Sequence, residues 1–180
     1  MTFQVDEPRI GVQPIAGIDT GLSYTSPGGV TTIIPSPPSM LGNIIRAFDP
    51  VLGEGEFILL KGVAGTVVGS CVIWDGAFAT TLAPATVMQA RPVAFAMSAN
   101  VNPAQFGWYQ IGGIVTADKD TSLAVNPNVP VGIVSAGKIG NTGVGLEIEN
   151  ARSVNTAIVA APTTTLQIEI NRPHLQGRIT

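Results

Sequence analysis

The sequence has little of the chemistry on which most enzymes and metalloproteins depend. It contains one cysteine and one histidine in 180 residues. Cys71 therefore has no intrachain disulfide partner, and its apolar surroundings in Val67–Trp74 predict a buried small residue. His174 is expected at the surface. Without a Cys/His cluster or a Ser-His-Asp triad, the sequence predicts no metal site, no cofactor, no catalytic residue and no enzyme.

Charge is also scarce. Charged residues make up 12% of the chain, against a usual ~25%. Only nine residues are Lys or Arg, and the net charge is −3, so no basic stripe for nucleic acid is expected. Residues 1–7 lack the pattern of a signal peptide, and no apolar run approaches the ~18 residues of a membrane span. We expect a protein made in the cytoplasm, with no membrane or nucleic-acid partner.

Residues that favour strands and turns are abundant. The chain has 19 Val, 18 Ile and 17 Thr, together with 21 Gly and 14 Pro. This composition predicts an all-β fold, and the spacing of the short strands predicts a compact β-barrel or β-sandwich. Local patterns add an extended N-terminal arm and one short helix, and the form that we expect is β-tulip-like. Alternating apolar residues predict core strands with six side chains inward, and a bulge or bend is expected at Gly112-Gly113. The six are Val144, Leu146, Ile148, Leu166, Ile168 and Ile170.

We divide the chain into an N-terminal arm, residues 1–38, and a β-rich core domain, residues 39–180. The arm is rich in proline, which interrupts strands and helices, yet it carries many apolar side chains that need a surface to cover them. It would lie either on a partner or neighbouring subunit, or as an irregular strand on its own domain. The predicted contact residues are Phe3, Val5, Arg9, Ile10, Val12, Ile15, Ile33 and Ile34.

The one helix is predicted over residues 39–48. Ser39 can cap it, and Asp49-Pro50 would end it. The apolar residues Met40, Leu41, Ile44, Ile45 and Phe48 recur at a spacing that fits one face of a helix.

Three motifs resemble reactive sites, and each has a simpler interpretation. Gly132–Lys138 matches most of a phosphate-binding loop, but Ile139 replaces the Ser or Thr that would hold Mg²⁺, so a hairpin is expected. Asp118-Lys119-Asp120 could hold a metal with paired carboxylates, although a solvated turn is favoured. Glu147 and Glu149 could act as paired carboxylates in hydrolysis, but outward-facing strand charges are the ordinary case.

Large aromatic residues are few. Trp74, Trp108 and Tyr109 are the candidates for a sugar-binding platform. Core packing is expected for two of them, which leaves a platform open for the third. Burial of both Trp108 and Tyr109 would disfavour a sugar-binding adhesin.

Several segments of residues 41–120 carry a resemblance to known proteins. They are Leu41–Pro50, Gly53–Phe57, Lys61–Val63, Pro92–Ala99 and Gly107–Ile111. This region resembles small proteins encoded among the head genes of tailed bacteriophages, and more loosely the capsid decoration, or cement, proteins. The resemblance implies a virion structural protein on the outer capsid surface, commonly a homotrimer at capsomer junctions, with the major capsid protein as its partner.

The expected function is therefore capsid decoration. The main alternative is a receptor-binding or tail-fibre adhesin domain. A carbohydrate-active enzyme and another β-structural subunit, such as a major shell component, are further alternatives. A homo-oligomer is expected because the core is not predicted to cover the apolar surface of the arm.

Overall fold

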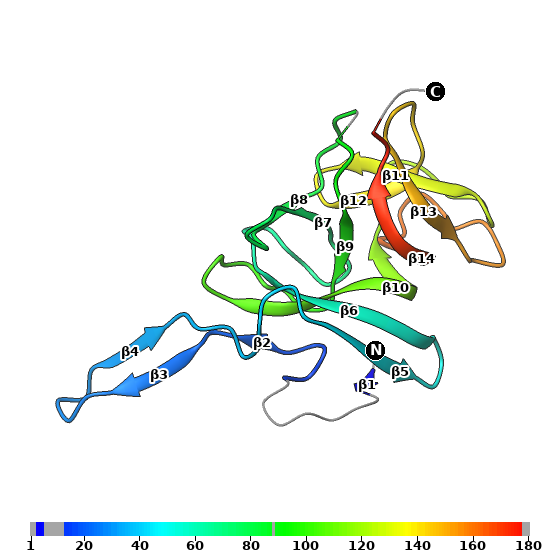
Figure 1. The fold of residues 1–180 in the computed structure, drawn as a ribbon. Helices are drawn as coiled ribbons and strands as arrows, with labels where there is room; N and C mark the ends of the chain where they lie inside the picture. The colour runs from blue at the N-terminus through cyan, green and yellow to red at the C-terminus, as the bar shows by residue number, and fades with distance from the viewer. Residues whose placement is uncertain (1–2, 6–12, 88, 178–180) are drawn as a thin grey trace.

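The computed structural model describes residues 3–5, 13–87 and 89–177, and every regular element in them is a β-strand (Figure 1). The all-β prediction is confirmed. The strands are β1 (Gln4–Val5), β2 (Ile18–Asp19), β3 (Leu22–Thr25), β4 (Thr31–Ile34), β5 (Ile44–Asp49), β6 (Gly53–Lys61), β7 (Cys71–Trp74), β8 (Thr80–Leu82), β9 (Val93–Ala96), β10 (Phe106–Asp118), β11 (Pro130–Ser135), β12 (Lys138–Asn141), β13 (Glu147–Ser153) and β14 (Thr165–Leu175).

Twelve strands form one curled antiparallel sheet, a half-barrel, in which β10 is central (Figure 1). One edge of β10 pairs with β6. Its other edge pairs in turn with β2, β9 and β14, and the sheet continues from β14 through β13 and β11 to β12. The remaining two strands, β3 and β4, form a separate hairpin.

The expected bulge in β10 is confirmed. The register between β10 and β6 shifts between Gln110 and Gly112. Gly113 has a φ of 89°, and a β-carbon there would lie 2.3 Å from the carbonyl oxygen of Glu54. Only glycine fits this position, and the bend lets one long strand pair with three successive neighbours.

Both faces of the central strands are buried, in two apolar clusters. Trp108 belongs to the larger cluster, with Phe57, Leu59 and Phe95. Its chain neighbour Tyr109 belongs to the smaller cluster. Because successive strand side chains point to opposite faces, β10 separates the two clusters. Cys71 is buried in the larger one, as predicted, and burial raises the pKa of its thiol.

The inward register predicted for the core side chains is confirmed on β14. It is confirmed only in part for residues 144–148, around the start of β13. Leu166, Ile168 and Ile170 are buried, as is Ile148 on β13. Val144 is exposed and Leu146 is half-buried, so the inward register predicted for Val144 is wrong. The strand begins only at Glu147, because a turn containing Gly145, with a φ of 74°, precedes it.

The predicted helix over residues 39–48 is wrong, since residues 44–48 belong to β5 and residues 39–43 form no regular element. The side chains of Ile44, Arg46 and Phe48 are exposed, and those of Ile45 and Ala47 are buried. A spacing of four residues places two side chains on one face of a helix, but also on one face of a strand, since four is even. The pairing of β5 with β6 decides between the two structures.

The described part of residues 1–38 does not form one extended arm. β1 pairs with β5, and β2 pairs with β10. Ile15 is buried in the larger cluster, and the indole N–H of Trp108 donates to the carbonyl of Gln13 at 3.2 Å. Apolar burial therefore ties these parts of the segment to the domain, in spite of the prolines. Within the described residues 13–38, the hairpin of β3 and β4 projects from the body of the molecule (Figure 1).

Candidate functional site

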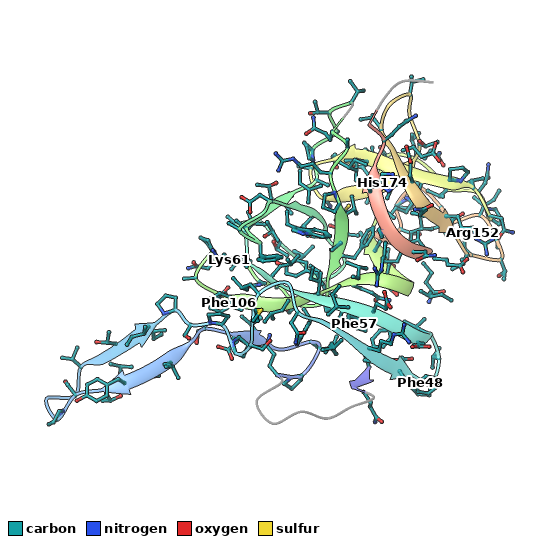
Figure 2. The ribbon with its side chains drawn as sticks, in the orientation of Figure 1. Phe48, Phe57, Lys61, Phe106, Arg152 and His174 are labelled. Carbon is teal, nitrogen blue, oxygen red and sulfur yellow. The ribbon has the colours of Figure 1, made fainter. Side chains whose placement is uncertain are left out.

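The hairpin, residues 22–34, is the largest exposed apolar element of the described chain. Leu22, Tyr24, Val30, Ile33 and Ile34 are each more than half exposed. No charged residue occurs from Thr20 to Ile45. Figure 2 shows the side chains of this element standing clear of the rest of the molecule. Exposed apolar patches of this kind mark interaction sites.

The register of the hairpin gives it two different faces. Residues directly opposite each other in an antiparallel pair share a face. The pairs Leu22–Ile34 and Tyr24–Thr32 therefore form one face, which we call the apolar face. The other face carries Ile33 with Ser23, and Thr25 with Thr31, whose hydroxyls lie 3.0 Å apart. The hairpin is thus amphipathic, although the described structure places no core against its apolar face.

Specific contacts fix the two ends of the hairpin. At the tip, the N–H of Gly29 donates to the carbonyl of Ser26 at 2.9 Å. At the base, Gly21 has a φ of 95°, and a β-carbon there would lie 2.3 Å from the carbonyl oxygen of Ile34. The close approach of the segments around Gly21 and Ile34 holds the hairpin in place at its base.

The predicted contact residues fall into three groups. Ile33 and Ile34 lie exposed on the hairpin. Phe3 is half-buried, with its ring edge-on to Phe57 at a centroid distance of 4.9 Å, and Ile15 is buried in the core. Val5 belongs to β1, while Arg9, Ile10 and Val12 lie outside the described residues. Ile15 has no surface left to offer a partner, so it leaves the candidate set.

Three hairpin residues were not among the predicted contacts: Leu22, Tyr24 and Val30. The sequence holds a signal for them. Two strand-like runs, 22–25 and 31–34, flank Ser26-Pro27-Gly28-Gly29, which is the pattern of a hairpin with a glycine-containing loop. Treating residues 1–38 as a single arm obscured it.

Trp108 and Tyr109 cannot form a sugar-binding platform, because their exposed fractions are 1% and 0%. Burial also raises the pKa of Tyr109 to about 12. Trp74 differs from both. It is half-buried at the end of β7 and lines a surface depression of about 500 Å³, which we call the aromatic depression. Its lining is Trp74, Asp75, Gly76, Phe78, Arg91 and Pro92.

Hydrogen bonds to backbone groups hold the turn that contributes Asp75 and Phe78 to the lining of the aromatic depression. Oδ1 of Asp75 accepts from the N–H groups of Ala77 and Ala79 at 2.9 and 3.0 Å. These bonds, with the nearby charge of Arg91, hold the pKa of Asp75 below its usual range. Phe78 has a φ of 58°, a conformation that is rare for an aromatic residue. The N–H of Lys61 donates to the Phe78 carbonyl at 3.1 Å and helps to hold it there.

The Asp118-Lys119-Asp120 motif is not the solvated turn that was expected. Lys119 is fully buried, and its ammonium donates to the carbonyls of Asp120, Ala161 and Thr163 at 2.8, 3.2 and 3.3 Å. Three acceptors use all three donors of the ammonium, and burial lowers its pKa. Lys119 therefore anchors the 161–163 loop to the end of β10.

The two carboxylates of this motif have different environments. Burial raises the pKa of Asp118, against the opposing effect of Lys138 at 3.7 Å. Asp120 accepts hydrogen bonds from Ser122 and Ser135, which lower its pKa to about 2. No group of three or more His, Cys, Asp or Glu within the described ranges could hold a metal ion.

The exposed charges on the curled sheet are largely paired with one another. Arg46 contacts Glu54 and Glu56 at 3.5 and 3.3 Å, and Arg172 contacts Glu56 at 3.3 Å. Arg152 pairs with Glu169 at 2.6 Å on the neighbouring strands. This surface therefore offers no concentration of one charge.

The remaining sequence motifs lie on strands of the curled sheet. Glu149 pairs with His174 at 2.8 Å across β13 and β14. The segment that resembled a phosphate loop is the β11–β12 hairpin, with Gly137 at a φ of 75° in its turn, as expected. The described residues also contain no helix long and apolar enough to cross a membrane.

No protein-family model matches this chain, and no curated protein matches it either. The exposed hairpin and the aromatic depression are the two surface features of the described residues that bear most directly on function.

Proposed function

We propose that this chain is a non-catalytic structural subunit that binds the outer surface of a bacteriophage capsid at capsomer junctions and stabilises the shell, as a decoration protein does. The observation that carries the proposal is the hairpin. Its apolar face is exposed, and it carries no charged residue. Contacts at the tip and at the base hold the hairpin in place. Burial of such a face by a partner stabilises the complex, by about 1.5–3 kcal/mol for each fully buried Leu or Ile.

The physical task of a decoration protein matches these features. A subunit that binds only the closed junction stabilises that state by mass action, because its contacts must be lost before the junction opens. An apolar contact suits a permanent interface. The resemblance of residues 41–120 to phage head proteins supports a capsid as the partner, with the major capsid protein as the contacted chain.

The proposal includes a homotrimer. A trimer presents three hairpins, and binding through the first raises the effective concentration of the other two at the same junction. Sedimentation equilibrium at micromolar protein concentration measures this directly, and a monomer there contradicts the trimer.

The test of capsid binding uses the two faces of the hairpin. The triple variant Leu22→Ser, Tyr24→Ser and Ile34→Ser removes the apolar face, whereas Ile33→Ser changes one residue on the opposite face. Ile33 and Ile34 have nearly equal exposed fractions, 53% and 55%, so the single variant Ile34→Ser is matched to Ile33→Ser. Co-sedimentation with capsids assembled without this protein measures binding.

We expect Ile34→Ser to weaken capsid binding by about tenfold, the equivalent of ~1.4 kcal/mol, and the triple variant to abolish it. Ile33→Ser should bind as the unchanged protein does. Equal binding by the triple variant and the unchanged protein would overturn the hairpin as the contact.

A receptor-binding or tail-fibre adhesin domain is the second candidate function. The burial of Trp108 and Tyr109 removes the platform on which it first depended. The aromatic depression around Trp74 is the observation that still favours it.

A further inference from the structure

The aromatic depression brings together two chain segments that are not adjacent in sequence. Trp74 ends β7, and Asp75, Gly76 and Phe78 follow in the turn before β8. Arg91 and Pro92 lead into β9, the strand that pairs with β7. Pairing of these strands therefore places an indole, a carboxylate and a guanidinium around one hollow.

We propose that the aromatic depression binds a neutral carbohydrate. Trp74 offers apolar ring surface that the core only partly covers. Asp75 uses Oδ1 for its turn, which leaves Oδ2 without a hydrogen-bond partner among the described residues. Arg91 is exposed beside it and supplies donors. The depression thus combines an apolar surface, an acceptor and a donor.

A sugar ring needs this combination. One face of a pyranose presents C–H groups that pack on an indole, and its edge presents hydroxyls that both donate and accept hydrogen bonds. A purely apolar ligand would cover Asp75 and Arg91 without giving them partners, which is costly. An anionic ligand would meet the carboxylate of Asp75. Among the residues that line the depression, the opposite charges of Asp75 and Arg91 balance, which favours a neutral sugar, although Lys61 also acts on Asp75 from outside the lining.

The size and order of the depression agree with this ligand. Its volume of about 500 Å³ lies within the ~300–1,000 Å³ of small-molecule sites. Several groups that shape it are fixed by the backbone bonds at Ala77, Ala79 and Phe78, so little ordering is needed on binding. The strained φ of Phe78 is of the kind that clusters at binding sites.

Tryptophan fluorescence tests the proposal on the whole chain. The protein has two tryptophans, and Trp108 is buried. A change in emission on adding a sugar therefore reports on Trp74. The probes are neutral oligosaccharides of glucose, mannose, galactose and N-acetylglucosamine at millimolar concentration, with oligogalacturonate as the acidic counterpart. Isothermal titration calorimetry with the same probes gives affinities for variants that lack the fluorophore.

We expect at least one neutral probe to shift the emission. Trp74→Ala should weaken its binding by about tenfold or more. Arg91→Gln changes an exposed side chain and leaves the core intact. We expect this variant to bind the sugar several-fold more weakly, which tests the proposal even if Trp74→Ala misfolds. Phe48→Ala, an exposed aromatic on β5, is the control and should bind normally.

Two results would overturn the inference. One is the absence of a response to every neutral probe in both fluorescence and calorimetry. The other is tighter binding of oligogalacturonate than of all neutral probes, because an acidic ligand contradicts the charge argument. Neither result bears on the hairpin, so capsid binding and sugar binding succeed or fail separately.

Discussion

Asp120 and Lys119 are adjacent residues, and their surroundings favour the charged form of Asp120 but disfavour the charged form of Lys119. The buried ammonium of Lys119 is fully hydrogen-bonded yet disfavoured by burial, whereas hydrogen bonds from Ser122 and Ser135 favour the carboxylate of Asp120. Both hold the end of β10 against its neighbouring loops.

The depressed pKa of Asp120 predicts a specific loss of stability in acid. Its pKa is about 2 in the folded protein, against ~3.9 unfolded. The unfolded chain therefore takes up the proton first, and the stabilising contribution, complete above about pH 4, is lost as the pH falls through about 2. We expect Asp120→Asn to be less stable than the unchanged protein at pH 6, with a difference that shrinks towards pH 2.

Urea denaturation between about pH 6 and 2 measures this difference. Asp118→Asn is the control, because a raised pKa gives the opposite sign: Asp118 in the folded protein takes up its proton before the unfolded chain does. The stability of Asp118→Asn should therefore fall in acid at least as steeply as the stability of the unchanged protein. Parallel curves for Asp120→Asn and the unchanged protein would contradict the assigned hydrogen bonds.

At the scale of elements, the hairpin and the segment before it should differ in their effect on stability. We expect replacement of residues 22–34 by a short Gly-Ser link to leave the melting temperature within about 3 °C, because no hairpin side chain is buried. Gly21 and Ser36 lie close enough for the link to close. Ile15→Ala, by contrast, should cost about 2–5 kcal/mol, since Ile15 is in the core. Circular dichroism during heating and urea titration measures both, and unfolding of the shortened protein would place the hairpin in the core.

The sequence predicted elements well where alternation and pairing agree. Leu166, Ile168 and Ile170 alternate with polar residues and are buried as expected. It failed where one spacing fits two structures, as for Ile44 and Phe48 on β5. It also failed for Ile15 and Lys119, since their burial depends on strands distant in the chain. Exposure of the hairpin depends on the same long-range packing, which local sequence does not encode.

At the scale of the whole molecule, charge should contribute little to assembly. The hairpin has no charged residue, and the charges of the sheet surface are paired locally. We expect capsid association to change by less than about twofold between 0.05 and 1 M NaCl. Ammonium sulfate should strengthen it, because excluded salts favour apolar burial. Co-sedimentation over both series measures this, and steep weakening by NaCl would point to ion pairs as the main contact.

The position of β14 has a consequence for synthesis. This strand is the last in chain order among those described, yet it lies inside the sheet, between β10 and β13. Until residues 165–175 emerge, the second half of β10 and one edge of β13 lack their partner. Folding of the sheet must then await the synthesis of β14, and until then open strand edges and apolar side chains are at risk of aggregation. The newly made chain is therefore a natural client for a chaperone, even though the finished fold is closed around its core.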